Sequence, residues 1–321
     1  MVYKRDAATD TYKLLSVSDQ MAQGRGYWIK VSTNDHRIDI DGDPTVSAQD
    51  FETPLVGSSG PGRWNLVGHP FVVEIPWADS RFVDASGTEW TPSEAEAQGV
   101  ASKSMYTWNG SAYQTWDDVT PGMLGTLGVF EGQWVKAFAT ATALRIPAMP
   151  ASGGAAPVRN LEEGEWLIRL TATSGDLSDP GNVFGQLAGS KSGLDVHDLP
   201  ERAPFNADYL TVVFPHPRWQ TEPWAYTTDF HGIVGFGSPG GDRERAQRWR
   251  FEIRRGTAGG NVVLSWQGPA EILQRSILVD LTSGRKIRPK PGGSLDIEMT
   301  TPIHRFKWIV LPVKGKEEGL R

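Results

Sequence analysis

Three aromatic side chains in one proline-rich stretch have the types and spacing needed to bind a sugar. Trp219, Trp224 and Tyr226 lie within residues 214–226, which also contain three prolines. A sugar ring stacks its apolar C–H face on an aromatic ring, while neighbouring polar groups bind its hydroxyls. The stretch therefore predicts a carbohydrate-binding loop. The alternative is that these rings cap a hydrophobic core.

Carboxylates at alternate positions form a second candidate site. Asp39, Asp41 and Asp43 offer the oxygen ligands that Ca²⁺ prefers, but no Glu follows at the distance that completes an EF-hand loop. Two interpretations stay open, a calcium site and a solvated acidic turn. The predicted cofactor is accordingly none, with calcium as the alternative.

A third cluster is Asp195, His197 and Asp198, which Asp176 and Asp179 precede in the sequence. If loops brought these groups together, they would suit a metal ion or an acid/base pair. Asp residues in turns also accept hydrogen bonds from backbone N–H groups. The alternative is therefore that Asp195 and Asp198 only fix a loop.

No motif predicts a catalytic residue. Residues Gly235–Gly240 match Gly-x-Gly-x-x-Gly, but Pro239 and the following glycine indicate a loop where a dinucleotide site requires a helix. Residues Gly189–Gly193 lack the pattern of a nucleophile elbow, and the histidines are scattered without a triad pattern. The chain is predicted not to be an enzyme.

Two segments of the chain look like copies of one β unit. Val2–Tyr12 and Gly26–Lys30 match Met105–Tyr113 and Gly132–Lys136 in order and residue type. Arg63–Pro70 supplies the second copy with an opening strand that the first copy lacks. We therefore expect a partial copy followed by a complete one, in a fragment of a longer chain.

The second copy contains the most distinctive turn signal of the sequence. Asn109-Gly110 separates two alternating, aromatic-rich runs. This pair is typical of a two-residue type I′ hairpin turn, in which both residues have positive φ.

The copies carry motifs that occur in a known group of proteins. Trp64–Pro70, Met105–Gly110 and Gly132–Lys136 resemble the Trp-x-Leu-[Val/Ile]-[Ser/Gly]-x-Pro, Leu-Tyr-x-Tyr and Gly-Tyr-Trp-[Leu/Val] modules of secreted bacterial multi-domain proteins. Gln133 replaces the usual Tyr, which the first copy keeps as Tyr27. The resemblance implies an extracellular or cell-surface location and a structural or adhesion role beside other domains or chains of the same assembly.

Composition and spacing predict an all-β protein of two regions. The 36 Gly, 22 Pro and 13 Trp favour short strands joined by tight turns. Residues 1–150 are predicted to form a repeat-built antiparallel β domain, and residues 151–157 a small-residue linker. Residues 158–321 are predicted to form an antiparallel β-sandwich, jelly-roll or immunoglobulin-like, and they resemble the sandwich that often follows such modules.

Charge and hydropathy limit the partners. The formal net charge is -6, and the basic segment Arg243–Arg255 alternates with apolar residues, which predicts a half-solvated strand rather than a nucleic-acid site. No apolar run is long enough to span a bilayer. Three functions remain: a non-catalytic structural or adhesion module, a carbohydrate-binding module with or without calcium, and an assembly subunit whose open sheet edge is completed by another chain.

Overall fold

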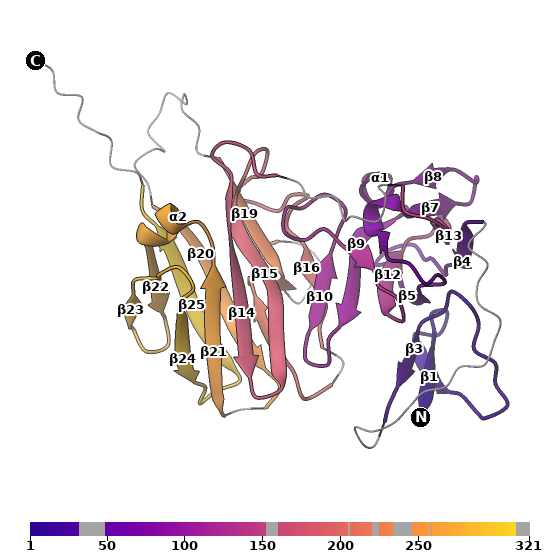
Figure 1. Cartoon of the computed structure of the whole chain (residues 1–321), viewed down its shortest axis with the longest axis horizontal. Helices are drawn as coiled ribbons and strands as arrows, with labels where there is room; N and C mark the ends of the chain where they lie inside the picture. Colours follow the sequence, from indigo (N-terminus) through magenta and orange to yellow (C-terminus); the bar gives the residue numbers. More distant parts are fainter. Residues whose placement is uncertain are drawn as a thin grey trace, which may run out of the picture. The chain divides into compact units, whose positions relative to one another are not determined.

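The computed structural model confirms the all-β prediction. It describes residues 1–31, 49–151, 160–204, 206–219, 225–233, 246–257 and 259–312. Within these residues, short helices interrupt a chain made of strands (Figure 1). No described helix has the length and apolar character needed to cross a membrane.

The chain divides into two compact units. Unit 1 comprises residues 1–107 and 115–160, and unit 2 comprises residues 108–114 and 161–321. The boundary near residue 160 falls just beyond the predicted linker 151–157. The inclusion of 108–114 in unit 2 was not anticipated from the sequence.

Unit 1 contains two sheets that correspond to the two sequence copies. The first has the order β2-β1-β3 and the second the order β10-β9-β12-β5. Their strands are β1 (Val2–Asp6), β2 (Thr11–Leu14), β3 (Tyr27–Ile29), β5 (Arg63–Gly68), β9 (Ala101–Trp108), β10 (Tyr113–Trp116) and β12 (Gly132–Ala137). The central three strands of each copy are thus arranged alike, and only the second copy has the additional strand β5.

The strand registers of the two copies also agree. Tyr3 lies opposite Trp28 in the first sheet, as Tyr106 lies opposite Trp134 in the second. The neighbouring pairs, Val2 with Ile29 and Met105 with Val135, correspond in the same way. The match seen in the sequence therefore extends to which residues face each other across the strands.

A third sheet covers the core of the second copy. Its order is β4-β13-β7-β8, and a two-stranded β6-β11 pair lies in the same unit. The elements are β4 (Phe51–Pro54), β6 (Ile75–Pro76), η1 (Trp77–Asp79), β7 (Arg81–Asp84), β8 (Glu89–Trp90), α1 (Pro92–Ala97), β11 (Thr126–Leu127) and β13 (Ala141–Ile146). Buried residues of both sheets, including Phe82, Met105, Val135 and Leu144, form one hydrophobic cluster.

The turn between β9 and β10 differs from the predicted type I′ turn. Gly110 has a φ of 100°, but Asn109 is not among the residues with positive φ. Instead, the Asn109 side-chain oxygen accepts hydrogen bonds from the backbone N–H groups of Ser111 and Ala112, both at 2.9 Å. This local side-chain bonding stabilises a longer loop than two residues.

Unit 2 is a β-sandwich of two five-stranded sheets, with orders β19-β15-β14-β21-β24 and β17-β20-β25-β22-β23. Their strands are β14 (Trp166–Ser174), β15 (Leu177–Leu187), β17 (Leu210–Val213), β19 (Thr228–Gly232), β20 (Gln247–Arg255), β21 (Asn261–Gln267), β22 (Ser276–Asp280), β23 (Lys286–Ile287), β24 (Ser294–Glu298) and β25 (Ile303–Val310). The remaining elements are the β16 (Pro200–Glu201) and β18 (Ala225–Tyr226) pair and α2 (Ala270–Gln274). From β19 to β22 successive strands alternate between the two sheets.

One strand pair departs from the predicted antiparallel sandwich. β15 and β19 are parallel, with Phe184 opposite Asp229. Parallel strands cannot be joined by a tight turn. The chain between them accordingly passes through the other sheet, in which it forms β17, before it returns as β19.

The sandwich core follows from the alternation of side chains along each strand. In β20, Trp249, Phe251 and Ile253 are buried, and they contribute to a cluster that also contains Phe184 and Trp308. Burial of large aromatic side chains is the main stabilising contribution that these strands make.

Gly26 and Gly68 allow the edge of β5 that faces away from β12 to bind a second segment, residues 24–26. Gly26 N–H donates to the Leu66 carbonyl at 3.1 Å, and Gly68 N–H donates to the Gly24 carbonyl at 3.0 Å. A Cβ atom on Gly68 would lie 2.6 Å from the Arg25 carbonyl oxygen. The close approach of the two backbones therefore requires Gly at position 68.

Gly68 lies opposite Gly132 across β5 and β12, and this pair provides a matched test. We expect Gly68→Ala to lower the free energy of unfolding by about 1–3 kcal/mol, because its new methyl group would overlap backbone. Gly132→Ala should change it by less than about 0.5 kcal/mol, because its Cβ would meet its nearest neighbour at 3.5 Å, an ordinary contact. Urea unfolding measures both, and equal losses would contradict the close-approach account.

Candidate functional site

The first candidate site is the edge of β3 that faces away from β1. The backbone groups of Met1 and Lys30 exchange two hydrogen bonds, of 2.9 and 2.8 Å. Bonded and non-bonded pairs alternate along an antiparallel ladder, so the N–H and C=O groups of Tyr27 and Ile29 point away from β1. No other described strand pairs with β3.

In the second copy, β5 occupies the corresponding edge. Gln133, the counterpart of Tyr27, lies opposite Val67, and Val135, the counterpart of Ile29, lies opposite Asn65. Asn65 is itself fixed, because its side chain exchanges hydrogen bonds of 2.9 Å with the backbone N–H and C=O of Val56. The second copy thus shows how a strand binds at this edge.

The two copies differ in how far the equivalent apolar side chains are buried. Ile29 is 39% exposed and Val31 is 48% exposed, whereas their counterparts Val135 and Ala137 are completely buried. Among the described residues, the backbone groups of Tyr27 and Ile29 on this edge therefore have no strand partner. The first copy also exposes apolar side chains whose counterparts in the second copy are buried. Such an edge binds an extended chain by adding it as a further strand.

The face of the first sheet that lies away from the Ile29 side chain is packed. The Tyr12 ring meets the Trp134 ring edge-on, with centroids 6.3 Å apart, and the Arg5 guanidinium carbon lies 5.6 Å from the Trp134 ring centroid. Arg5 also forms an ion pair with Asp10. These contacts lie within unit 1 and hold the first sheet on one side.

The predicted sugar-binding aromatics form a compact stack at the sandwich core. The Trp219 ring lies parallel to the His216 ring at 3.5 Å between centroids, and the Tyr226 ring meets Trp219 edge-on at 4.9 Å. Tyr226 is 3% exposed and belongs to the core, while Trp219 is partly buried against it. Burial of Tyr226 corresponds to the core-cap alternative. Trp224 lies outside the described residues.

His216 is also part of a group that sequence inspection did not assemble. Its Nε2 atom lies 3.0 Å from Oδ2 of Asp229, and the Nε2 atom of His231 lies 3.6 Å from Oδ1 of the same carboxylate. His231 stacks on Trp249, and burial lowers the pKa of His231 although Asp229 opposes this shift. The i, i+2 spacing of Asp229 and His231 on one strand was the available signal.

The Asp229 carboxylate between two imidazoles has, within the described residues, no hydroxyl partner of the kind that a nucleophilic triad contains. In the described part of the chain, the Nε2 atom of neither imidazole is hydrogen-bonded to a Ser, Thr or Tyr hydroxyl group, and no three His, Cys, Asp or Glu side chains are grouped to hold a metal. The predicted metal residues Asp39, Asp41 and Asp43 and the glycine motif at 235–240 lie outside the described part of the chain.

Asp195, His197 and Asp198 fix a loop through the backbone. The Asp195 carboxylate accepts hydrogen bonds from the N–H groups of Lys191 and His197, at 2.6 and 2.8 Å. Asp198 accepts them from Asp195 and Phe230, at 2.9 and 3.2 Å. Burial nevertheless raises the pKa of the Asp198 carboxyl to about 8. The geometry matches the loop-fixing alternative.

A second group of buried carboxyls lies in the same unit. Asp179 accepts hydrogen bonds from the Val212 N–H and the Asn182 side chain, both at 2.7 Å, and from the Thr211 hydroxyl at 3.0 Å. Burial raises the pKa of Asp179 in spite of these bonds. Burial, and then the charge of Asp179, raise the pKa of Glu201 well above its usual value.

Comparison with protein-family models, with curated proteins and with solved structures finds no match to this chain.

The raised pKa of Asp198 predicts how stability depends on pH. Because the folded state holds this proton more tightly than the unfolded chain, the stabilisation is complete below pH 4 and is lost as the pH rises to about 8. The lowered pKa of His231 acts in the opposite direction, but only below about pH 6.5. Between pH 6.5 and 8 we therefore expect Asp198 by itself to lower the free energy of unfolding by about 1 kcal/mol per pH unit. Glu201, whose pKa burial also raises, acts in the same direction.

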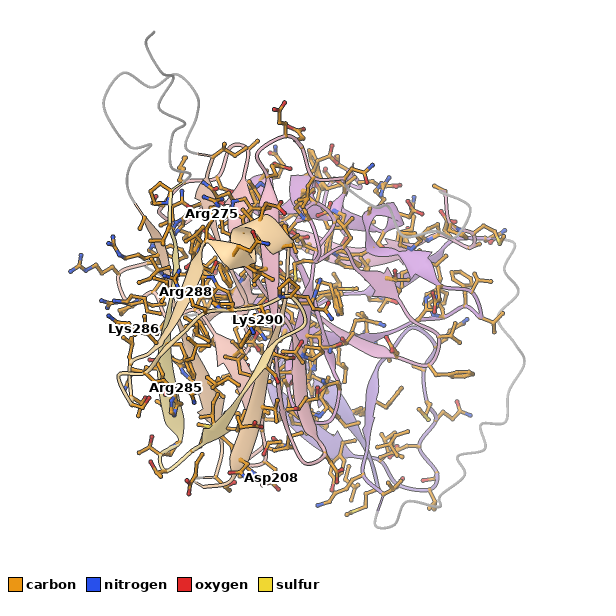
Figure 2. All side chains as sticks on the ribbon, turned by 60° about the vertical axis from the view of Figure 1, so that its left-hand side comes forward. Asp208, Arg275, Arg285, Lys286, Arg288 and Lys290 are labelled. Carbon is orange, nitrogen blue, oxygen red and sulfur yellow. The ribbon has the colours of Figure 1, made fainter. Side chains whose placement is uncertain are left out.

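Urea unfolding at several pH values measures this slope. Asp198→Asn should reduce it, whereas Asp208→Asn, at an exposed carboxylate labelled in Figure 2, should leave it unchanged. A slope that is the same in wild type and in both variants would show that Asp198 does not hold a proton in this range.

Proposed function

We propose that this chain is a non-catalytic structural module of an extracellular or cell-surface assembly, in which the incomplete first sheet is completed by a strand from another domain or chain. The observation that carries the proposal is the edge of β3, which has no partner strand among the described residues. The motif resemblance to secreted bacterial multi-domain proteins supports the location and the structural role.

The second copy indicates the chemistry of the completing strand. β5 places Val67 opposite Gln133, and Val67 is completely buried in the core of its copy. A strand of the same kind beside β3 would pair with Tyr27 and Ile29 and would cover apolar side chains that are now exposed. The added strand would form hydrogen bonds with backbone groups of β3 that otherwise bond to water.

A synthetic peptide with the sequence of residues 60–70 tests this proposal on the full chain. We expect it to bind and to slow hydrogen exchange of the Tyr27 and Ile29 amides, because its backbone would accept their hydrogens. Exchange of the Trp28 amide, which faces β1, should change least. Amide exchange followed by NMR measures all three residues in one experiment.

The matched control is the same peptide with the residues equivalent to Asn65 and Val67 replaced by Pro. Removing two backbone donors should weaken binding by about 10-fold or more. Equal binding by the two peptides would contradict strand addition. So would protection of Trp28 without protection of Tyr27 and Ile29.

A second candidate function is carbohydrate binding at Trp219, with or without calcium. It is favoured by the fixed orientation of the Trp219 ring, which His216 and Tyr226 hold from two directions. A preorganised ring binds a sugar with little loss of side-chain entropy.

For this candidate, Trp219→Ala should abolish the retardation of the protein by soluble polysaccharide in affinity electrophoresis. The gels are run with calcium and with chelator. Trp219→Phe should keep part of the retardation, because a ring remains available for stacking. A melting temperature that falls by many degrees in the Ala variant, with retardation unchanged, would assign Trp219 to the core alone.

A further inference from the structure

The outer face of one sandwich sheet gathers basic side chains from three distant segments. In β20, Trp249 and Phe251 point into the core, so Arg248 and Arg250 lie on the outer face, where both are exposed. The same alternation places Lys307 of β25 and Lys286 of β23 on that face, and Arg288, which is exposed, follows directly after the end of β23. These five residues are called the basic face.

The strand registers align these charges in a row. Arg250 lies opposite Lys307, Lys307 lies opposite Val279, and Val279 lies opposite Lys286. Three cations therefore span four neighbouring strands, a width of about 14 Å. Like charges directly opposite each other destabilise a sheet, so this arrangement has a cost in the absence of an anion.

Carboxylates of the described residues do not neutralise the row. Glu252 is the acidic residue at the outward positions of these strands, and it is already engaged by Arg254 at 2.8 Å and Arg305 at 3.0 Å. None of the five residues of the basic face has an ion pair with another described residue. This concentration of positive charge occurs in a chain whose formal net charge is -6.

The basic face continues along the edge of the sheet. Arg275, Arg285, Lys286, Arg288 and Lys290 are labelled in the left half of Figure 2, over the part of the sandwich that contains α2 and β23. Lys286, Arg288 and Lys290 are exposed, whereas Pro289 between them is buried. The Lys290 carbonyl accepts hydrogen bonds from the Trp266 indole at 2.9 Å and from Gly293 N–H at 3.0 Å, which fix this backbone segment.

We infer that the basic face binds an acidic polysaccharide. A row of cations along one sheet face matches a linear polymer that carries sulfates or carboxylates at intervals, and Arg guanidinium groups bind such groups in bidentate fashion. The outward residues between the cations are aliphatic, namely Ile277, Val279 and Ile309. The described face therefore offers no aromatic platform on which nucleic-acid bases would stack.

Heparin, as a sulfated probe, and alginate, as a uronate probe, test the inference with the full chain. We expect at least one to bind at low salt, with an affinity that falls as salt rises. Arg250→Gln combined with Lys307→Gln should weaken binding by about 10-fold, because it removes two central cations. Its melting temperature should not fall, since the opposed like charges are removed as well.

The matched control is Lys191→Gln combined with Arg218→Gln, which removes the same charge from exposed positions outside the basic face. It should retain binding within about twofold. The inference is overturned if neither probe binds at low salt, or if the control pair weakens binding as much as the test pair. It is also overturned if single-stranded DNA of equal charge binds more tightly than both polysaccharides, or if phosphatidylglycerol vesicles do.

Discussion

A β-strand has two edges on which it can form hydrogen bonds, and the organisation of unit 1 depends on the fact that β5 uses both. One edge pairs with β12 along its full length, and the other reaches Gly24 and Gly26, just before β3. This double pairing joins the complete copy to the incomplete one. It also requires Gly68, because any side chain there would meet the Arg25 carbonyl. The first copy has no such strand of its own among the described residues, and its apolar side chains remain correspondingly exposed.

Much of the architecture could be predicted from local sequence patterns. Alternation of charged and apolar residues in the basic segment correctly indicated a strand, which the structure shows as β20 with Trp249 buried. The similarity between Val2–Tyr12 and Met105–Tyr113 was visible because aromatic residues of the same kind occur in the same order in both segments. These features depend on neighbours in the chain, so one sequence was sufficient to detect them.

Features that depend on pairing between distant segments could not be predicted in this way. The parallel β15–β19 pair has no local signature, and the basic face combines residues near positions 250, 286 and 307 whose alignment is set by strand register. From sequence, the charges of β20 alone suggested an ordinary solvated strand. The contact between Asp229 and His216 could likewise not be predicted, because the two residues are 13 positions apart and are brought together by the fold of the loop that carries His216. Trp219 and Tyr226 of the aromatic stretch lie in contact, but the sequence left open whether these rings bind a ligand or cap the core, and Tyr226 is buried in the core.

The parallel pairing of β15 with β19 has a consequence for the order of folding. The strands β14 and β15 form a hairpin whose residues are close in sequence, whereas β19 can pair with β15 only after the intervening chain, about 40 residues long, has closed a loop. Such loop closure is entropically costly and slows the formation of non-local contacts. The pairing of β14 with β21 closes a still longer loop, residues 175–260, so we expect β19 to join the β14–β15 hairpin before β21 does. Because β19 is an edge strand, the Asp229–histidine group is expected to be lost early when the edge of that sheet opens.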